Sequence, residues 1–342
     1  MKIFFDNLLL IDKGGIYIYF QELFKFLNSK KYSFHVDFFE IPESTKLPER
    51  FTLKKKRFLE RIRKCEVSNE FDIFHSSYYR IPKDKNIKVV TTIHDFTHQK
   101  FLSGYKSYIN MYIKMRAIKR SDAIICISEN TKKDLLSYYK PLQNQKLDVI
   151  YNGISSSYKK NNSKVFNYKK IFLYVGHRVN YKNWDIALKL LEDQKDFKLV
   201  VVGGDPDEDK FYQNIDKNLR ERIIFRGFIT NEALNDLYNE AFCLFYPSSY
   251  EGFGIPVIEA MAAGCPVIAN DECEAVKEIA GNLPLYFNIK KRNFSEVFDS
   301  LKNTYRVERI NNGLKHALNF SWDKNFTELS KIYKSLMYNK RS

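Results

Sequence analysis

The feature that most constrains the fold is an alternation of short apolar strands with helical segments, and it occurs twice along the chain. Strands that are hydrophobic throughout and separated by helices are typical of parallel sheets covered on both faces. We therefore expect the α/β class, with two Rossmann-like doubly wound domains. In the first half the apolar runs are KIFFDN (2–7), SFHVDFF (33–39), DIFHS (72–76), VVTTIH (89–94), DAIICIS (122–128) and LDVIYN (147–152). In the second half they are IFLYVG (171–176), FKLVVVGG (197–204), IIFRG (223–227), FCLFYPS (242–248) and PVIAN (266–270).

The two alternating halves are joined by a polar stretch. The sequence ISSSYKKNNSKVFNYKK is rich in Ser, Asn and Lys, which is typical of a linker. A length of 342 residues also suits two domains. We expect an N-terminal domain over residues 1–155, a linker over 156–170, a C-terminal domain over 171–320 and a final amphipathic helix over 321–342.

Composition narrows the class of protein. No apolar run approaches the roughly 18–20 residues of a membrane-spanning helix, and the N-terminal MKIFFDN is interpreted as a strand rather than a signal peptide. The five cysteines are scattered and form no CxxC pair, which predicts buried, reduced thiols in a cytoplasmic protein. With 56 basic and 41 acidic residues the net charge is +15, which suits nucleic acid, anionic lipid or a phosphorylated substrate. No nucleic-acid-binding motif accompanies this charge, so no nucleic acid partner is expected.

Two glutamates stand eight positions apart in PSSYEGFGIPVIEAMAAGCP (247–266). Pro256 suits the first turn of a helix and Gly264 its end, which puts Glu259 one turn inside the helix and Glu251 before it. The first amides of such a helix and its dipole predict an anion site. Carboxylates do not favour a phosphate, so the two glutamates would instead accept hydrogen bonds from hydroxyls, such as those of ribose and a sugar. The alternative is that Glu251 caps the helix and Glu259 is a solvated surface residue.

Cations and a histidine follow other predicted strands. In parallel α/β sheets ligands bind beyond the carboxyl ends of the strands, which for two facing domains predicts a site in the cleft between them. Arg178 and Lys182, in VGHRVNYKN, could hold a diphosphate or be two surface cations. His94 could contact a sugar hydroxyl or a reacting centre, or be a structural hydrogen-bond partner. The spacing of histidines and carboxylates matches no metal pattern, so no metal is expected.

Two further segments could bind anions. LIDKGGIYIYF (10–20) is a loop before a helix, in which Gly14 and Gly15 could let backbone amides approach a phosphate or hydroxyl. It lacks GxGxxG, so a dinucleotide fingerprint is not supported. LKKKRFLERIRKC (53–65) interleaves apolar residues with cations. As a helix it could lie on an anionic membrane surface, or it could be an ordinary helix buried on one face.

The ordered set of motifs resembles a known family. YVGHRVNYKN followed by EGFGIPVIEAMAAGCPVI resembles the signature of retaining glycosyltransferases of family 4, whose Glu-x7-Glu motif matches Glu251 and Glu259. ICISENTKKDLL, VIYNGI, IIFRGFITNEALNDLY and FSWDK resemble its other landmarks in order. Arg178 and Lys182 with the following Asn are most similar to the mannosyltransferase-type subgroup of bacterial surface-polysaccharide synthesis. The resemblance implies the GT-B architecture, with two domains facing across a cleft and the last helix crossing back to the first domain.

The resemblance also implies roles for single residues. Glu251 would bind hydroxyls of the donor sugar, and Glu259 would bind the ribose hydroxyls. Arg178 and Lys182 would neutralise the diphosphate leaving group, a role that a metal fills in other transferases, so no cofactor is expected. His94 would contact the donor sugar near its 6-hydroxyl.

Backbone groups complete the implied donor site. The amides of Phe253 and Gly254 would lie near the donor sugar, and those around Ile255 and Val257 would hold phosphate. The base would meet the backbone of one loop, made of Gly227, Phe228 and Ile229.

One loop departs from the family pattern. The family often reads Gly-Gly-Ile-Gly-Arg-Tyr there, whereas Gly14, Gly15 and Ile16 are followed here by Tyr17 and Ile18. The usual arginine is absent, so the family's handling of the acceptor does not carry over to this loop.

The expected function is transfer of a hexosyl group, with retained anomeric configuration, to a glycan or lipid-linked acceptor. The donor expected first is GDP-mannose and second a UDP-hexose. The expected location is cytoplasmic, either free or peripheral at the inner membrane face. Three alternatives remain open: a sugar-nucleotide epimerase of the same fold, a glycosidase with paired carboxylates, and a non-catalytic basic protein that binds nucleic acid or membrane.

Overall fold

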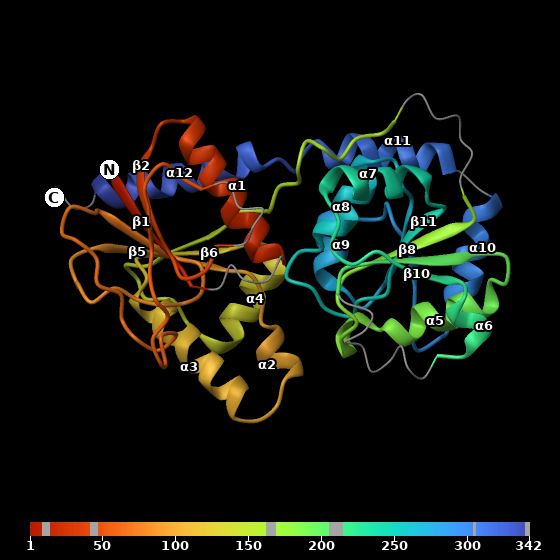
Figure 1. Cartoon of the computed structure of the whole chain (residues 1–342), viewed down its shortest axis with the longest axis horizontal. Helices are drawn as coiled ribbons and strands as arrows, with labels where there is room; N and C mark the ends of the chain where they lie inside the picture. Colours follow the sequence, from red (N-terminus) through yellow and green to blue (C-terminus); the bar gives the residue numbers. More distant parts are fainter. Residues whose placement is uncertain (9–13, 42–46, 162–168, 205–214, 304–305, 339–342) are drawn as a thin grey trace. The chain divides into compact units, whose positions relative to one another are not determined.

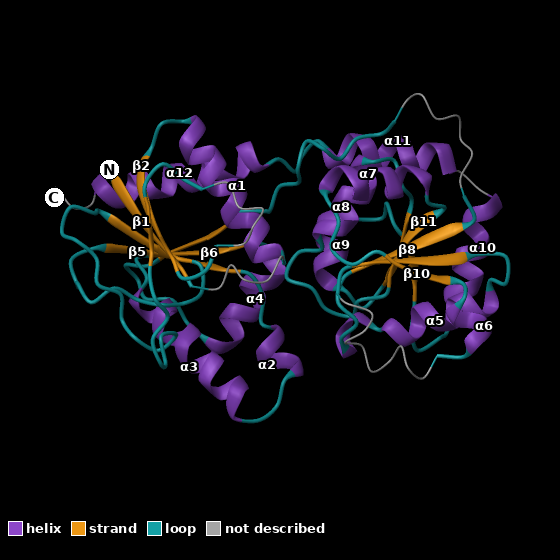
Figure 2. Ribbon diagram, viewed as in Figure 1, coloured by secondary structure: helices purple, strands orange, loops and turns teal. Residues whose placement is uncertain are grey.

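The computed structural model in Figure 1 divides into two compact units, Met1–Gly153 with Trp322–Ser342, and Ile154–Ser321. Each unit is a parallel sheet with helices on its two faces (Figure 2). The expected fold class, two Rossmann-like α/β domains, is therefore confirmed. The residues that the structure describes are 1–8, 14–41, 47–161, 169–204, 215–303 and 306–338.

The first unit has the strand order β3-β2-β1-β4-β5-β6-β7. Its strands are β1 (Lys2–Asn7), β2 (Ser33–Phe38), β3 (Phe51–Leu53), β4 (Ile73–Ser76), β5 (Lys88–Ile93), β6 (Ala123–Cys126) and β7 (Lys146–Val149). Its helices are α1 (Gly15–Ser29), α2 (Thr97–Phe101), α3 (Tyr105–Arg120), α4 (Glu129–Tyr138) and α12 (Trp322–Tyr338). Ser128 is the N-cap of α4, where its side chain accepts a hydrogen bond from the amide of Thr131 (2.9 Å).

Alternating side chains give this sheet two buried faces. On β1, Ile3 and Phe5 pack with α1 and α12, while Phe4 packs on the other side with Phe74. The C-terminal helix α12 belongs to this unit, and the Tyr333 hydroxyl lies 2.7 Å from Nδ1 of His75 on β4. The last helix of the chain therefore completes the core of the first sheet.

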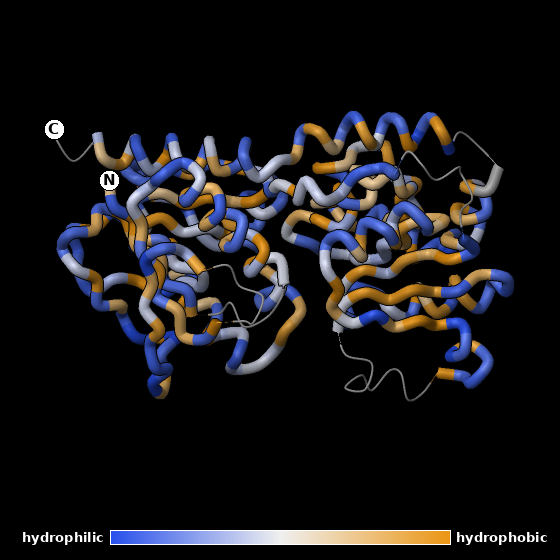
Figure 3. Tube along the Cα trace, turned by 45° about the horizontal axis from the view of Figure 1, so that its top comes forward, coloured by the Kyte–Doolittle hydropathy of each residue, from blue (hydrophilic) through white to orange (hydrophobic). Residues whose placement is uncertain are grey.

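The second unit has the strand order β10-β9-β8-β11-β12-β13. Figure 3 shows that its strands are apolar along most of their length, as expected for a sheet covered on both faces. Its strands are β8 (Ile171–Val175), β9 (Lys198–Val202), β10 (Ile223–Phe225), β11 (Cys243–Tyr246), β12 (Val267–Asn270) and β13 (Leu285–Phe287). Its helices are α5 (Trp184–Asp193), α6 (Lys217–Arg220), α7 (Asn231–Glu240), α8 (Ile255–Ala262), α9 (Glu274–Ala280), α10 (Phe294–Asn303) and α11 (Arg306–Ala317).

The strand order of the second unit reverses direction between β8 and β11, which pair directly through Cys243 and Phe172. The connections after these two strands therefore leave the sheet side by side. This reversal is where doubly wound sheets bind ligands. The segments that follow β8 and β11, residues 176–183 and 247–254, are thus the ones that topology brings together.

The prediction of a basic helix over residues 53–65 is wrong. β3 ends at Leu53, and the following segment is an irregular run of turns. The cause is Glu60, which is buried and binds Arg57 and the buried Arg80 (2.7 Å), while Arg80 also binds Asp6 on β1 (2.8 Å). These charged side chains line a hollow of about 250 Å³, and their pairing fixes the loop conformation.

The second unit begins at Ile154, so the first residues of the predicted linker over 156–170 belong to this unit. Tyr158 is buried, and its ring lies 6.0 Å from that of Tyr238 on α7. Residues 162–168 of the predicted linker lie outside the described residues. The start of this stretch is therefore packed on the second unit.

Candidate functional site

A lysine and a glutamate meet where the strand order of the second unit reverses. Lys182, after β8, places Nζ 2.8 Å from Oε1 of Glu251, after β11. Their side chains are only 14% and 15% exposed. Two residues that the sequence singled out separately therefore form one charged pair at the predicted edge of the sheet.

The loop that carries Lys182 is cross-linked to the loop that carries Glu251. Asn183 adopts a left-handed conformation (φ 48°), and its Nδ2 donates to the Pro247 carbonyl (2.7 Å) and to Oγ of Ser249 (2.8 Å). The amide of Ser249 donates back to the Tyr181 carbonyl (2.8 Å). These bonds hold the lysine and the glutamate in a fixed relation.

Arg178 is fixed against the ends of two neighbouring strands. Its Nη1 donates to the Gly203 carbonyl after β9 (2.9 Å), and its guanidinium lies 5.1 Å from the centre of the Phe225 ring on β10. At Gly204 (φ 72°) an added Cβ would stand 2.9 Å from Nη2 of Arg178. Only glycine therefore combines this backbone conformation with the close approach of the guanidinium.

The N-terminus of α8 lies directly after Glu251 in the chain. Gly254 precedes the helix with φ 102°, and an added Cβ there would stand 3.1 Å from Cγ2 of Val276. The first amides of a helix have no partner inside it and carry its positive dipole end. The amide of Val257 already donates to the Gly254 carbonyl (3.0 Å), which leaves the earlier amide of Ile255 as the better candidate for an anion.

Glu259 is buried inside the second unit, only 6% exposed. Its Oε2 accepts a hydrogen bond from the Tyr238 hydroxyl (3.3 Å), and the Tyr158 hydroxyl also interacts with this carboxyl group. Burial raises the pKa of Glu259 to about 7, although both tyrosine hydroxyls act in the opposite direction. The alternative that Glu259 is a solvated surface residue is therefore wrong. Glu251 is not the helix cap either, since Gly254 holds that position without a side-chain cap bond.

Sequence reasoning missed both tyrosines. Tyr238 occupies a buried position of α7, and Tyr158 lies in the stretch predicted to be a linker. The one available signal was an aromatic residue within the polar stretch around Tyr158.

The loop with Gly227, Phe228 and Ile229 adjoins the segment that carries Arg178. The Gly227 carbonyl accepts a hydrogen bond from the Gly203 amide (2.8 Å). The Phe228 side chain is 51% exposed, and its ring lies 6.0 Å from that of His177. The loop thus offers a partly exposed aromatic ring beside the charged residues.

His94, Gly14 and Gly15 belong to the first unit, and the structure does not test their predicted contacts. His94 is buried, and its ring lies 5.1 Å from that of Tyr19. Burial lowers the pKa of His94 to about 4, so the ring is neutral at pH 7. Within the described residues, Nε2 of His94 has no hydrogen-bond partner. Gly14 precedes α1 with φ −89°, which other residues also adopt, and residues 9–13 lie outside the described part.

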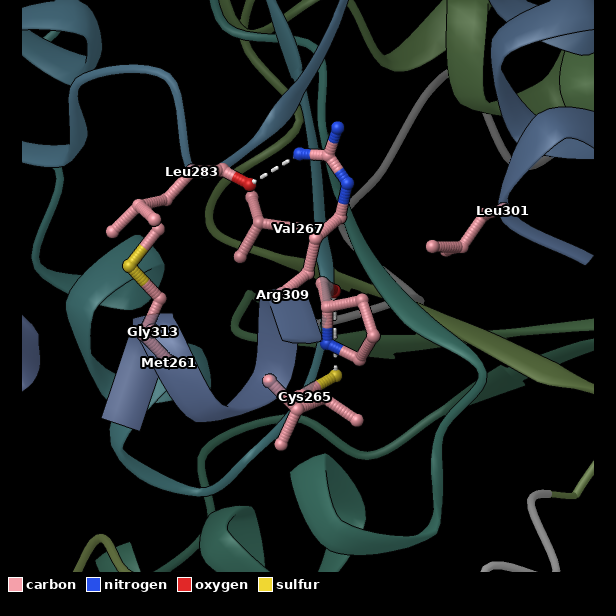
Figure 4. A pocket seen from close by; sticks show the side chains of 9 residues that line it. Met261, Cys265, Val267, Leu283, Leu301, Arg309 and Gly313 are labelled. Carbon is pink, nitrogen blue, oxygen red and sulfur yellow. Dashed lines mark hydrogen bonds between the residues drawn. The ribbon is translucent and has the colours of Figure 1, made fainter. Parts of the chain in front are cut away.

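A small cavity in the second unit lies apart from these residues (Figure 4). It has a volume of about 10 Å³ and lies between Met261 of α8 and Gly313 of α11. Arg309 at its wall donates to the Leu283 carbonyl (3.0 Å). A space of this size holds at most about one water molecule, so the cavity is a packing gap rather than a substrate site.

The described residues contain neither a cluster suited to a metal ion nor a membrane-spanning helix. No group of three or more His, Cys, Asp or Glu side chains in this part of the chain is arranged to hold a metal ion. None of the helices there is both long and apolar enough to span a bilayer. All five cysteines lie in the described part, where they are buried and form no disulfide.

Two protein-family models match consecutive parts of the chain. Residues 21–158 match "Glycosyltransferase Family 4", and residues 157–304 match "Glycosyl transferases group 1". The O-antigen chain mannosyltransferase RfbU of Salmonella typhimurium is 31% identical over 218 residues, which cover 62% of this chain and 60% of that protein. The matched regions span 60–64% of the lengths of the first curated relatives.

Solved structures show the same fold at low sequence identity. Sucrose-phosphate synthase from Thermosynechococcus elongatus superposes with a TM-score of 0.79 at 17% identity. The superposition covers 99% of this chain and 100% of the synthase chain. HepE of Anabaena, solved in complex with UDP and glucose, superposes with a TM-score of 0.75 at 16% identity. The superposition covers 98% of this chain and 100% of the HepE chain.

Proposed function

Because this chain belongs to the glycosyltransferases of family 4, we propose that it transfers a hexosyl group from a nucleotide diphosphate sugar to a hydroxyl of a glycan or lipid-linked acceptor, with retention of the anomeric configuration. The observation that carries the proposal is the convergence of Arg178, Lys182, Glu251 and the start of α8 at one edge of the second sheet. Cations and helix amides suit a diphosphate, and the carboxylate beside them suits hydroxyl groups.

In the proposed reaction the bond between the anomeric carbon and the diphosphate oxygen breaks, and the acceptor oxygen bonds to the same face of that carbon. Negative charge grows on the departing diphosphate, and Arg178 and Lys182 stabilise it together with the helix dipole. A phosphate oxygen of the leaving group takes the proton of the acceptor hydroxyl. The products are the glycosylated acceptor and a nucleoside diphosphate.

The Lys182–Glu251 pair supports separate roles for its two members, with Lys182 on a phosphate and Glu251 on the sugar. The ammonium of Lys182 has three donors, so it can keep Glu251 in place while it binds a phosphate oxygen. Glu251 would then accept hydrogen bonds from sugar hydroxyls through its second oxygen. Glu251 would thereby hold the sugar at a set distance from Lys182, whose charge stabilises the departing diphosphate.

The proposed place of the ribose is Glu259. A buried carboxyl group within reach of two tyrosine hydroxyls has a fixed orientation, and it can accept hydrogen bonds from a pair of adjacent ribose hydroxyls. His94 is a neutral ring whose Nε2 has no hydrogen-bond partner among the described residues, and it is proposed to bind a donor-sugar hydroxyl. The backbone of Gly227–Ile229 is proposed to face the base.

Mannose from GDP-mannose is the first proposed donor, because RfbU is named a mannosyltransferase. A UDP-hexose is the second, because HepE binds UDP and glucose in its solved structure. We propose that the chain acts in surface-polysaccharide synthesis in the cytoplasm, at the inner face of the membrane if its acceptor is lipid-linked, and that Arg178 and Lys182 make a metal unnecessary.

Calorimetric titration with a panel of nucleotide diphosphate sugars tests the proposal, followed by turnover of the tightest binder with Arg178→Ala and Lys182→Ala. Both variants should lose most turnover, and nearly unchanged turnover would contradict the diphosphate role. Nuclear magnetic resonance of the donor in the absence of acceptor distinguishes a transferase from an epimerase, because only the epimerase would still convert the donor to another sugar nucleotide. Hydrolysis of a glycoside without nucleotide would indicate a glycosidase, and salt-sensitive RNA binding without donor binding would indicate a nucleic-acid protein.

A further inference from the structure

The first unit has a strand reversal of its own. Its sheet runs in one direction from β1 through β2 to β3 and in the other from β4 through β5 and β6 to β7, so the order reverses between the adjacent strands β1 and β4. The chain therefore leaves these two strands side by side at their carboxyl ends, where Asp6 pairs with Ser76 in the ladder. Doubly wound sheets bind ligands at such a reversal, which makes this edge a candidate site within the first unit.

Buried polar side chains without hydrogen-bond partners gather at this reversal. Asn7 is the last residue of β1 and Ser77 directly follows β4, and they are only 1% and 4% exposed. Among the described residues, Nδ2 and Oδ1 of Asn7 and Oγ of Ser77 have no hydrogen-bond partner. The same holds for Nε2 of His94, which directly follows β5. Three neighbouring strands, β1, β4 and β5, thus each lead to an unpartnered polar side chain.

The three side chains lie on one face of the sheet. Side chains alternate along a strand, so Asn7 shares the face of Phe5 and Ser77 shares that of His75, and both of these residues pack on α1. The ring of His94 lies 5.1 Å from that of a tyrosine on the same helix. Because neighbouring strands lie about 4.8 Å apart, one small molecule can reach all three groups.

The opposite face of the same strand ends shows polar groups that are satisfied within the chain. Asp6, one residue before Asn7, accepts hydrogen bonds from Nη1 of Arg80 (2.8 Å) and from Oγ of Ser76 (3.3 Å). Buried polar groups are ordinarily hydrogen-bonded, and leaving them without partners destabilises a fold. The unpartnered groups on the α1 face therefore point to a ligand that supplies their hydrogen bonds.

The chemistry of these groups fits a neutral ligand that is rich in hydroxyls. The amide of Asn7 offers two donors and an acceptor, and the hydroxyl of Ser77 can both donate and accept. Neither side chain carries a charge, and burial keeps the ring of His94 neutral at pH 7. A sugar hydroxyl also both donates and accepts, so two adjacent hydroxyls can satisfy both polar atoms of Asn7.

We propose that Asn7 and Ser77 bind hydroxyl groups of a neutral acceptor sugar and thereby determine which sugar is accepted. This inference rests on the proposed function, because only a transferase has an acceptor, and it names the residues that select it. A site built to hydrogen-bond a hydroxyl discriminates strongly against an analogue that lacks it. His94, which is proposed to bind the donor sugar, follows the neighbouring strand β5, so the acceptor sugar is held one strand away from it.

The test uses the full chain in the presence of the nucleoside diphosphate that binds tightest, with the methyl glycosides of mannose, glucose, galactose and N-acetylglucosamine as probes. Titrations followed by saturation-transfer nuclear magnetic resonance should detect binding of at least one glycoside. Asn7→Leu and Ser77→Ala should each weaken that binding about tenfold and leave the calorimetric affinity for the nucleoside diphosphate unchanged. The matched controls are Asn28→Leu and Ser137→Ala, at exposed positions of the same unit, which should bind like the natural chain.

Deoxy derivatives of the tightest-binding glycoside separate recognition from a structural role. Removal of the hydroxyl that Ser77 binds should weaken binding to the natural chain about tenfold. The same removal should have little effect in Ser77→Ala, which has no partner for that hydroxyl. Thermal unfolding gives a second readout. Asn7→Leu replaces an unpartnered buried amide by an apolar group of similar volume, so its unfolding temperature should not fall.

Failure of every glycoside to bind the natural chain would overturn the proposal, as would equal binding by the natural chain and both variants. Binding that is lost in Glu251→Gln but kept in Asn7→Leu and Ser77→Ala would place the glycoside in the donor-sugar site and would also overturn it. If Asn7→Leu does not fold, Ser77→Ala and its deoxy series decide alone. A nucleotide sugar that binds while no glycoside does would leave the proposed function standing. Glycosides that bind through Ser77 while no nucleotide sugar binds would contradict the proposed function and keep the sugar site.

Discussion

Lys182 and Glu251 lie on different connections of the second sheet, yet their Nζ and Oε1 atoms are 2.8 Å apart. The strand reversal between β8 and β11 explains the meeting, because it places the ends of these two strands side by side. A cation suited to phosphate and a carboxylate suited to hydroxyls thus share one hydrogen bond. The proposed binding of the donor depends on this pair.

Loss of either cation should weaken diphosphate binding more than nucleoside binding. A hydrogen bond to a charged group contributes about 1.5–3 kcal/mol, so Arg178→Ala and Lys182→Ala should each lower the affinity for the nucleoside diphosphate about tenfold to a hundredfold. Calorimetry with the diphosphate and with the free nucleoside measures this difference. The control is Lys189→Ala, at an exposed lysine on α5 that should leave both affinities unchanged. Equal losses for the two ligands would argue against a diphosphate role.

Nucleotide binding should depend on the ionisation of Glu259, whose pKa burial raises to about 7. Ribose hydroxyls donate to a carboxylate better than to a carboxylic acid, so affinity should increase as the pH rises through about 7 and then level off. Glu259→Gln should bind about tenfold or more weakly and lose this increase. Titrations from pH 5.5 to 8.5 check the profile.

Two variants control the Glu259 prediction. Tyr238→Phe removes a donor to the carboxylate and should move the midpoint of the profile to higher pH. Glu296→Gln, at an exposed residue of α10, should leave the profile as it is. A midpoint that stays in place in Glu259→Gln would assign the pH dependence to another group.

The conformation of Gly254 should matter for binding as well as for folding. Gly254→Ala would strain a residue with φ 102° and press on Val276, at a cost of about 1–3 kcal/mol in the free energy of unfolding. It should also shift the start of α8 and weaken nucleotide binding. Gly281→Ala is the matched control, because its φ is also positive (54°) but its added Cβ meets nothing within 4 Å. The control should lose stability without losing affinity for the nucleotide. Equal nucleotide affinities in the two variants would contradict a binding role for the start of α8.

The first unit should lose stability in mild acid because of two buried histidines. Burial lowers the pKa of His75 to about 3 and that of His94 to about 4, so both stay neutral when folded. In the unfolded chain they take up protons below about pH 6.5. The histidines should therefore lower the free energy of unfolding as the pH drops from about 6.5 toward 4. Buried Asp6 on β1 acts in the opposite sense, because burial raises its pKa to about 6 and its stabilising contribution is lost as the pH rises through that value.

Hydrogen exchange of the amides of β4 and β5 at pH 7 and pH 5, corrected for intrinsic rates, measures this loss. His94→Leu should make the decrease smaller. Glu259 acts in the opposite sense in the second unit, because its raised pKa gives stability that is present below about pH 4.5 and lost as the pH rises through about 7. The same change in protection of β4 and β5 in His94→Leu as in the natural chain would contradict the assignment to the histidines.

Local signals in the sequence predicted much of the fold. The strand run of residues 2–7, and the Pro256 and Gly264 that bracket α8, depend on neighbours within a few residues. Such features are decided by backbone preferences and by short-range hydrogen bonds. The sequence therefore located both sheets and the edge where Arg178, Lys182 and Glu251 meet.

Features decided by distant partners could not be predicted in the same way. The segment 53–65 has a helical pattern, but Glu60 is buried in an ion pair with Arg80. This pairing overrides the local preference for a helix. The burial of Glu259 depends on Tyr158, roughly a hundred residues earlier in the chain.

The most direct test of the account is a crystal structure of the chain with the nucleoside diphosphate that binds tightest. The account predicts diphosphate oxygens within hydrogen-bonding distance of Arg178 and Lys182 at the start of α8, and ribose hydroxyls on Glu259. A nucleotide bound elsewhere on the chain, with Lys182 and Glu251 still paired and far from any phosphate, would contradict it.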